Sequence, residues 1–294
     1  MTGALLLLGA SFAVTVNKRR LLRNLSKPVM ADFSYYLMVA LCSFLAYFVV
    51  YSKLTPLLLK TLVFRLYSSL DKSRQVYVNW LTASLLYTSV VGPCALLVHH
   101  FDQDLAKSAV LRYDSPAVRG ISAILLGYTA GETVKTLTDV VDSTDLSLSE
   151  FLVHHVVSCG ATLVTCVSCF VCLPVYPCLP VYSNLVLATE CSTIWLNIRL
   201  LLKEFGIPHS SAINRCNNFV FFLVFSYVRV WLLVVRMYIP LTSLLLTKEF
   251  YAMEVPVVVT FVFGSQFFVF INLNWYRRLC KRFSSNDLGY GNDG

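Results

Sequence analysis

Long apolar runs dominate the chain, and short polar connections separate them. A run of about 20 apolar residues is the length that an α-helix needs to cross the hydrocarbon core of a bilayer. Seven runs approach this length, at approximately 33–51, 76–98, 117–138, 151–172, 179–202, 216–238 and 255–274. Because lipid offers backbone amides no hydrogen-bond partner, the pattern predicts an all-α, polytopic helical membrane protein.

The composition agrees with this prediction. Hydrophobic residues make up 57% of the 294 residues and charged residues 14%, whereas a soluble domain carries about 25% charged residues. The connections between the runs are too short to hold a soluble domain, and the chain shows no internal repeat. We therefore predict a single membrane domain.

The first 32 residues form an apolar and then basic segment before the first run. Residues 3–16 are apolar but short for a span, no basic residue precedes them, and they show no clear cleavage site. We predict a signal-like or interfacial segment, with an eighth span as the alternative. The chain then divides into 1–32, this segment; 33–75, a first transmembrane helix and basic connector; 76–274, a six-helix domain; and 275–294, a basic and then polar tail.

The net charge is +8, and the basic residues gather near the ends of the runs. We interpret them as determinants of membrane topology that also attract anionic lipid head groups. We expect no nucleic-acid partner, because that role needs a soluble basic module. With seven spans, the C-terminus shares one side with the 52–75 connector, and positive charge favours the cytosol for that side. The glycosylation sequon Asn24-Leu25-Ser26 then lies on the non-cytosolic side.

The chain has ten cysteines, and the spacing of Cys166, Cys169 and Cys172 resembles a metal-binding pattern. On a membrane helix, however, a free cysteine is usually a small apolar filler, which is the role that we predict. The alternatives are metal binding, or acylation of Cys172, Cys178 or Cys280 near the membrane edge. The sequence indicates no disulfide framework.

Polar residues inside membrane spans are functional hypotheses by default, because charge is costly in hydrocarbon. In this chain they concentrate in four central runs, and they are Tyr128, Glu132 and Lys135; His154 and His155; Glu190, Asn197 and Arg199; and Arg229 and Arg236. Glu190 and Asn197 are seven residues apart, two helical turns, and therefore share a helix face. Arg199 projects from the side of the helix opposite Glu190.

The adjacent pair His154 and His155 stands out among these residues. Successive helical positions are about 100° apart, so both rings cannot point at one atom, and helical two-histidine metal sites prefer i, i+4 spacing. We therefore predict a general base, or a hydrogen-bonded partner of Glu190, and no metal site. The alternative is a structural polar network that ties helices together. Candidate catalytic residues are thus His154, His155 and Glu190.

Three stretches carry a resemblance to a known family: LGYTAGE at 126–132, LSEFLVHHVVSCGA at 148–161 and ATECSTIWLNIRLLLK at 188–203. Together they resemble the TLC (TRAM–Lag–CLN) domain family, over about 76–274. With VNWLTASLLYTSVVGPCALL at 78–97, the chain is most similar to TLC domain-containing proteins 1 and 2. The resemblance implies a six-helix TLC bundle around a central cavity, preceded by one further transmembrane helix. The candidate cavity-lining residues are Tyr128, Glu132, Ser192, Asn197, Arg199 and Arg229.

The family that this chain resembles divides by chemistry. Ceramide synthases acylate a sphingoid amine with acyl-CoA, and they carry the His pair with a later Asp-x-Ser-Asp motif, where this chain has Glu190-Cys191-Ser192-Thr193. The most similar proteins are linked to phospholipid acyl composition and membrane fluidity at the plasma membrane. The resemblance thus implies a lipid-homeostasis protein of the plasma membrane, rather than the endoplasmic reticulum, that binds phospholipid or an acyl chain without a cofactor.

Two alternatives to this interpretation stay open. The first is an acyl-CoA-dependent acyltransferase, the only enzymatic activity that the residues favour. The second is a seven-span receptor or transporter, although no Asp-Arg-Tyr follows the third run and no Asn-Pro-x-x-Tyr occurs in the seventh. The sequence favours a non-enzymatic role, and the oligomeric state does not follow from it.

Overall fold

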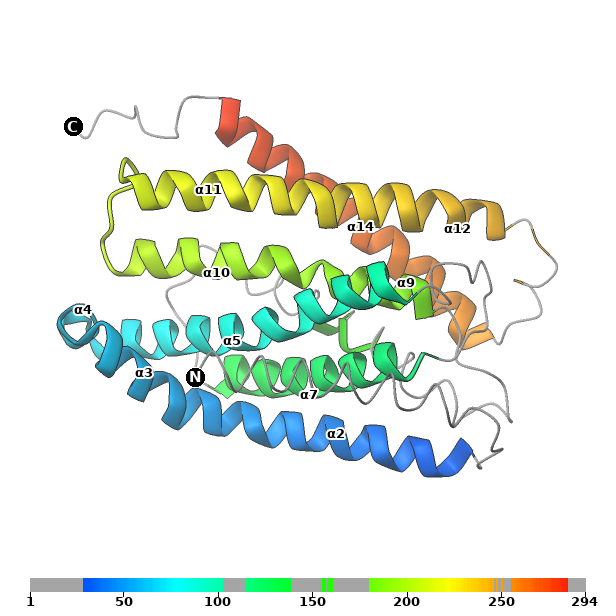
Figure 1. Ribbon diagram of the computed structural model, residues 1–294, viewed down its shortest axis with the longest axis horizontal. Helices are drawn as coiled ribbons and strands as arrows, with labels where there is room; N and C mark the ends of the chain where they lie inside the picture. Colours follow the sequence, from blue (N-terminus) through cyan, green and yellow to red (C-terminus); the bar gives the residue numbers. More distant parts are fainter. Residues whose placement is uncertain are drawn as a thin grey trace.

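The computed structural model describes residues 29–102, 115–138, 155–156, 158–160, 180–245, 247, 250 and 255–284. Within these ranges the chain forms helices and no β-strand, which confirms the predicted all-α class. The helices run roughly along the long axis of an elongated bundle (Figure 1). Because no sheet is present in the described chain, every functional side chain is positioned by helix–helix packing.

The helices follow the predicted runs, and two of them contain π-helical turns. In chain order they are α2 (Val29–Val49), the π-helical η2 (Val50–Leu54), α3 (Thr55–Leu62), α4 (Phe64–Ser69), α5 (Lys72–Phe101), α7 (Pro116–Thr138), α9 (Pro180–Ala188), α10 (Glu190–Glu204), α11 (Ala212–Phe225), the π-helical η3 (Ser226–Tyr238), α12 (Ile239–Leu244) and α14 (Val255–Ser284).

Four helical stretches of the described chain are long and apolar enough to cross a membrane, which makes this an integral, multi-pass membrane protein. They are Ser34–Leu62, Lys72–Phe101, Val181–Glu204 and Ala212–Tyr238. The predicted runs 117–138 and 255–274 coincide with α7 and α14, whereas run 151–172 lies largely outside the described residues. The first span extends beyond residue 51 because η2 and α3 continue the helix of α2.

One face of α2 consists of exposed apolar side chains. Leu37, Met38, Leu41, Leu45 and Val49 are each more than half exposed, and they recur every three or four residues. This spacing places them on a single stripe of the helix. An exposed apolar stripe in a membrane-spanning helix is the surface that lipid chains cover.

The opposite face of α2 packs against α7 through small residues. A methyl group added at Gly127 would collide with the carbonyl oxygen of Ala40, and one at Gly131 would lie 2.8 Å from the ring of Tyr47. Ser43 also donates a hydrogen bond to the carbonyl of Ile124, at 2.8 Å. Close backbone approach through paired small residues is the usual way in which membrane helices associate, because lipid provides no hydrophobic driving force between them.

The span that contains α9 and α10 is broken at Thr189. The amide of Thr189 donates to the carbonyl of Val186 at 3.0 Å, and the amide of Ser192 donates to Thr189 at 3.1 Å, so the turn is tighter than an α-helix. Gly92 of α5 lies against this break, since an added methyl group there would lie 2.5 Å from the amide nitrogen of Cys191. The break therefore starts α10 at Glu190, pressed against α5.

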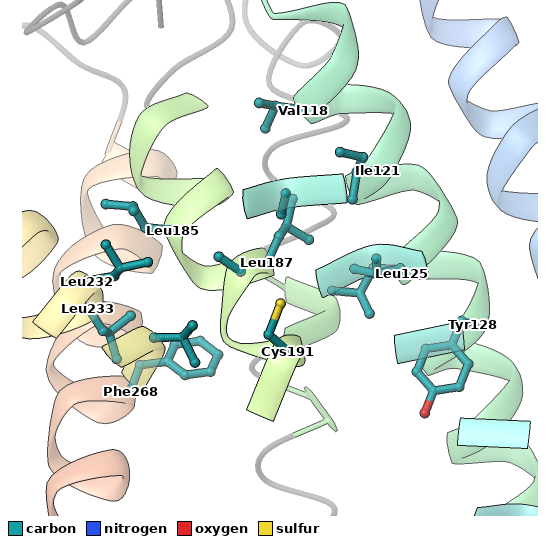
Figure 2. Close-up of a cluster of buried hydrophobic side chains, with 14 of the residues drawn as sticks. Val118, Ile121, Leu125, Tyr128, Leu185, Leu187, Cys191, Leu232, Leu233 and Phe268 are labelled. Atoms are coloured by element: carbon teal, nitrogen blue, oxygen red, sulfur yellow. The ribbon is translucent and has the colours of Figure 1, made fainter. Parts of the chain in front are cut away.

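The apolar core joins eight of these elements around the middle of the bundle. Figure 2 shows α7 contributing Val118, Ile121, Leu125 and Tyr128, with Leu185, Leu187, Cys191, Leu232, Leu233 and Phe268 supplied by α9, α10, η3 and α14. The same buried set includes Tyr47 of α2, Tyr51 of η2, and Val91 and Ala95 of α5. The core fixes the relative positions of the helices that carry the polar residues described next.

Candidate functional site

A cavity of about 120 Å³ lies among α5, α7, α10, η3 and α14. Its lining comprises Trp80, Ser84, Leu125, Tyr128, Thr129, Glu132, His155, Ser158, Glu190, Thr193, Leu196, Asn197, Leu200, Arg229 and Trp275. The volume exceeds the roughly 10–15 Å³ that one water molecule requires. Apolar walls thus surround a cluster of ionisable groups.

Glu132 and His155 form the closest pair of ionisable groups in the cavity. The Nε2 atom of His155 lies 3.4 Å from Oε2 of Glu132, and both side chains are almost fully buried. Nδ1 of His155 lies 3.3 Å from the hydroxyl of Thr133. The α7 helix supplies both Glu132 and Thr133, so it holds the imidazole from two sides.

The hydroxyl of Thr133 fixes which nitrogen of His155 carries a proton. This hydroxyl has one proton, and it donates it to the carbonyl of Thr129 at 2.7 Å. Its oxygen therefore accepts a hydrogen bond from Nδ1–H of His155. Nε2 then faces the carboxyl group of Glu132, and a protonated His155 forms an ion pair with the Glu132 carboxylate.

Ser84 connects three helices next to this pair. Its hydroxyl oxygen accepts hydrogen bonds from Oη of Tyr128 at 2.9 Å and from Nδ2 of Asn197 at 3.0 Å. Glu132 also interacts with the side chains of Ser84 and Tyr128. Since a hydroxyl that accepts two bonds still has its own proton to donate, Ser84 is placed to direct that proton towards the carboxyl group of Glu132.

Arg229 is the buried cation of the cavity, with 5% of its surface exposed. Three neutral acceptors hold it: Nε donates to Ser192 at 2.6 Å, Nη1 to Asn272 at 2.9 Å and Nη2 to Thr193 at 3.1 Å. These bonds come from α10 and α14, so the guanidinium has a fixed orientation. Glu190 lines the same cavity as Arg229.

Aromatic rings cover the guanidinium as well. Its central carbon lies 5.5 Å from the ring centroid of Phe225 and 5.6 Å from that of Trp275. Contacts within about 6 Å of an aromatic face are attractive for a cation, more so where water is excluded. Arg229 is therefore stabilised in position without a carboxylate within 4 Å among the described residues.

Both irregular helical segments of this region supply an ionisable group. Glu190 begins α10 directly after the break at Thr189, and Arg229 lies within the π-helical η3. Irregular backbone at membrane depth is tolerated where it is enclosed by protein or lines a cavity. Segments of π-helix are rare and are frequent at functional sites.

The structure brings most of the predicted site residues together. Tyr128, Glu132, His155, Glu190, Asn197 and Arg229 line one cavity. Ser192 is outside the lining and accepts a hydrogen bond from Arg229. Arg199 is half-buried and is also outside the lining. His154 lies outside the described residues. The shared face predicted for Glu190 and Asn197 is confirmed.

The predicted acidic partner of the histidine pair needs correction. We expected Glu190, but within the described chain the carboxylate in contact with His155 is that of Glu132. The reason is that α7 presents Glu132 and Thr133 to the same ring, and a contact between different helices cannot be read from spacing within one run. Glu190 lines the same cavity.

Metal ligands do not gather in the part of the chain that the structure describes: no three His, Cys, Asp or Glu side chains come together there. The predicted metal-like spacing at Cys166, Cys169 and Cys172 lies outside the described residues. No family model, no curated protein and no solved structure matches the chain. The geometry of the cavity is thus the main basis for a functional proposal.

Proposed function

We propose that this protein is a lipid-homeostasis membrane protein of the TLC type, which binds a phospholipid or an acyl chain in its cavity. In this role it regulates the acyl composition of phospholipids and the fluidity of the plasma membrane. The observation that carries the proposal is the cavity itself, where Glu132, His155, Glu190 and Arg229 meet inside an apolar bundle.

Burying these ionisable groups in an apolar bundle costs free energy. An unsatisfied polar group in an apolar medium costs several kcal/mol, and buried ion clusters are often replaceable by apolar residues without loss of stability. Ionisable residues at membrane depth are therefore functional hypotheses. The apolar wall, with Trp80, Leu196 and Leu200, offers an acyl chain contacts beside the polar groups.

A second candidate function is acyl-CoA-dependent lipid acylation, and the tautomer of His155 is the observation that favours it. With Nδ1 donating to Thr133, Nε2 is the atom that faces Glu132 and is placed to take up a proton. Such a pair can accept a proton from an amine or hydroxyl acceptor. Acyl-CoA would supply the acyl group. Product formation by the purified protein, given acyl-CoA and a lipid acceptor, distinguishes this candidate from the first.

The cellular test replaces the endogenous protein with the His155→Ala variant and measures phospholipid acyl chains by mass spectrometry. We expect a changed acyl profile at unchanged protein abundance and localisation, because the substitution removes the partner of Glu132. Arg199→Gln is the matched control, since it alters a membrane-span residue outside the cavity lining. An acyl profile that changes only in proportion to protein abundance would contradict the proposal and indicate a structural role.

A further inference from the structure

The connection between the first two described spans is short and held in place by hydrogen bonds. Residues 63–71 join α3 to α5, and α4 occupies most of them. The hydroxyl of Tyr67 in α4 donates to Oδ1 of Asn79 in α5 at 3.2 Å. Nε2 of Gln75 donates to the carbonyls of Tyr67 at 3.3 Å and Leu70 at 3.0 Å. Because one membrane span ends here and the next begins, α4 lies at the level of the lipid head groups.

Large apolar side chains of this connection are exposed. Leu62, the last residue of α3, and Phe64 of α4 are each more than half exposed, and Leu66 is exposed as well. Phenylalanine and leucine side chains of a segment at head-group level are buried at the boundary between head groups and acyl chains. The outer face of the connection therefore offers contacts to a lipid chain.

Exposed basic side chains alternate with these apolar ones. Lys60 lies in the last turn of α3 and Arg65 lies in α4, and both are exposed. Neither has an ion-pair partner among the described residues, whereas Arg74 pairs with Asp71 at 3.6 Å. Asp71 is the one acidic residue in the sequence of the 52–75 connector, which has five basic residues. The connection is thus positively charged and complements an anionic partner.

We propose that this connection binds one anionic phospholipid. Lys60 and Arg65 bind its head group, and Leu62 and Phe64 contact its acyl chains. A soluble anion would use the basic side chains alone, and a zwitterionic lipid would gain little from their charge, so an anionic lipid is the partner that uses both sets. None of these four residues lines the cavity, and the site is therefore independent of the function proposed for the cavity.

The experiment places the photoreactive analogue benzoylphenylalanine at Phe64 of the full-length protein, in nanodiscs of phosphatidylcholine with a minor share of phosphatidylserine. Mass spectrometry then identifies the crosslinked lipid. We expect phosphatidylserine to be enriched ~5-fold over its share of the bilayer, the effect of about one basic side chain near an anionic lipid. The same analogue at Phe263 of α14 is the control, because this residue is similarly exposed and the sequence 255–276 has no charged residue. Capture at Phe64 in the bilayer proportion, as expected at Phe263, would overturn the proposal.

Two double variants then separate a local site from the general positive charge of the protein. Lys60→Gln with Arg65→Gln should reduce the enrichment at Phe64 to the bilayer proportion. Arg277→Gln with Lys281→Gln removes the same charge from exposed positions at the end of α14, which lies away from α4 (Figure 1), and should keep the enrichment. Enrichment that survives in the first variant, or that both variants lose equally, would overturn the assignment of this site.

Discussion

At the residue scale, the tautomer of His155 depends on one hydroxyl group. Thr133 and Thr136 are both on α7, and both donate a hydrogen bond to the carbonyl four residues earlier. They differ because the oxygen of Thr133 also contacts Nδ1 of His155. The two threonines therefore form a matched pair for mutagenesis.

We predict that Thr133→Val destabilises the protein by about 1–3 kcal/mol, the cost of a buried donor left without an acceptor. The valine keeps the shape of the side chain and leaves the Nδ1–H of His155 unsatisfied. Thermal unfolding of the purified protein measures the effect, and Thr136→Val should lower the melting temperature less. Equal shifts for the two variants would contradict the assigned role of Thr133.

The sequence predicted which polar residues enter the cavity better than it predicted their partners. Charged and amide groups within apolar runs are conspicuous, and so Glu132, Glu190 and Arg229 were identified. Ser84 and Thr133 were missed, because small hydroxyl residues are common in membrane helices and carry no signal of their own. Which side chains contact one another depends on how the helices pack. The residue spacing within one helix carries no information about that packing.

At the element scale, close approach of α2 and α7 makes Gly127 indispensable to the packing of the bundle. In an ordinary helix interior, replacing glycine by alanine stabilises by about 0.5–1 kcal/mol. At Gly127 the added methyl group would collide with the backbone of Ala40, which a side-chain rotation cannot relieve. Gly264 of α14 has no neighbouring atom within 4 Å of the added methyl group and serves as the matched control.

We therefore predict opposite signs for the two substitutions. Gly127→Ala should lower the thermal stability by about 1–3 kcal/mol, the range for overpacking a tight interface. Gly264→Ala should leave it unchanged or slightly higher. Melting curves of both variants in the same detergent decide the matter, and a Gly127→Ala variant as stable as the unmodified protein would show that α2 and α7 are not in backbone contact.

The sequence predicted helix ends where the apolar composition changes. It did not predict irregular turns within a helix. The run 76–98 corresponds to α5, extended by a few residues at each end. The break at Thr189 and the π-helical η3 lie inside apolar runs without glycine or proline at the irregular residues. A nearly continuous apolar run gives no local signal of such changes.

At the scale of the whole molecule, most of the exposed basic side chains of the described residues gather at one end of the bundle. That end contains α4, the start of α5, the end of α10, the start of α11 and the end of α14 (Figure 1). Its exposed basic residues are Arg65, Lys72, Arg74, Lys203, Arg215, Arg277, Arg278 and Lys281. The positive-inside rule predicts that this end faces the cytosol. The helix α2 starts at the opposite end.

Of the seven predicted membrane crossings, four are supported by helices of the described chain, and the arrangement of the helices was not predicted. The apolar length of a run is a local property of the sequence and can be predicted from it. Four of the predicted spans form helices that are long and apolar enough to cross a membrane. The pairing of α2 with α7, and of α5 with α10, depends on small residues that meet across helices. The predicted TLC family membership stays a prediction, and the orientation follows from charge only once the helix ends are placed.

The last prediction tests that orientation with two epitope tags, one at the C-terminus and one inserted after Ser210 in the exposed turn between α10 and α11. Exposed turns tolerate insertion well. Both tags belong to the basic end, so external protease should spare both in intact cells and digest both after permeabilisation. Digestion of both in intact cells would reverse the orientation. Digestion of only one would contradict the bundle, because the end of α10 and the end of α14 would then lie on different sides of the membrane.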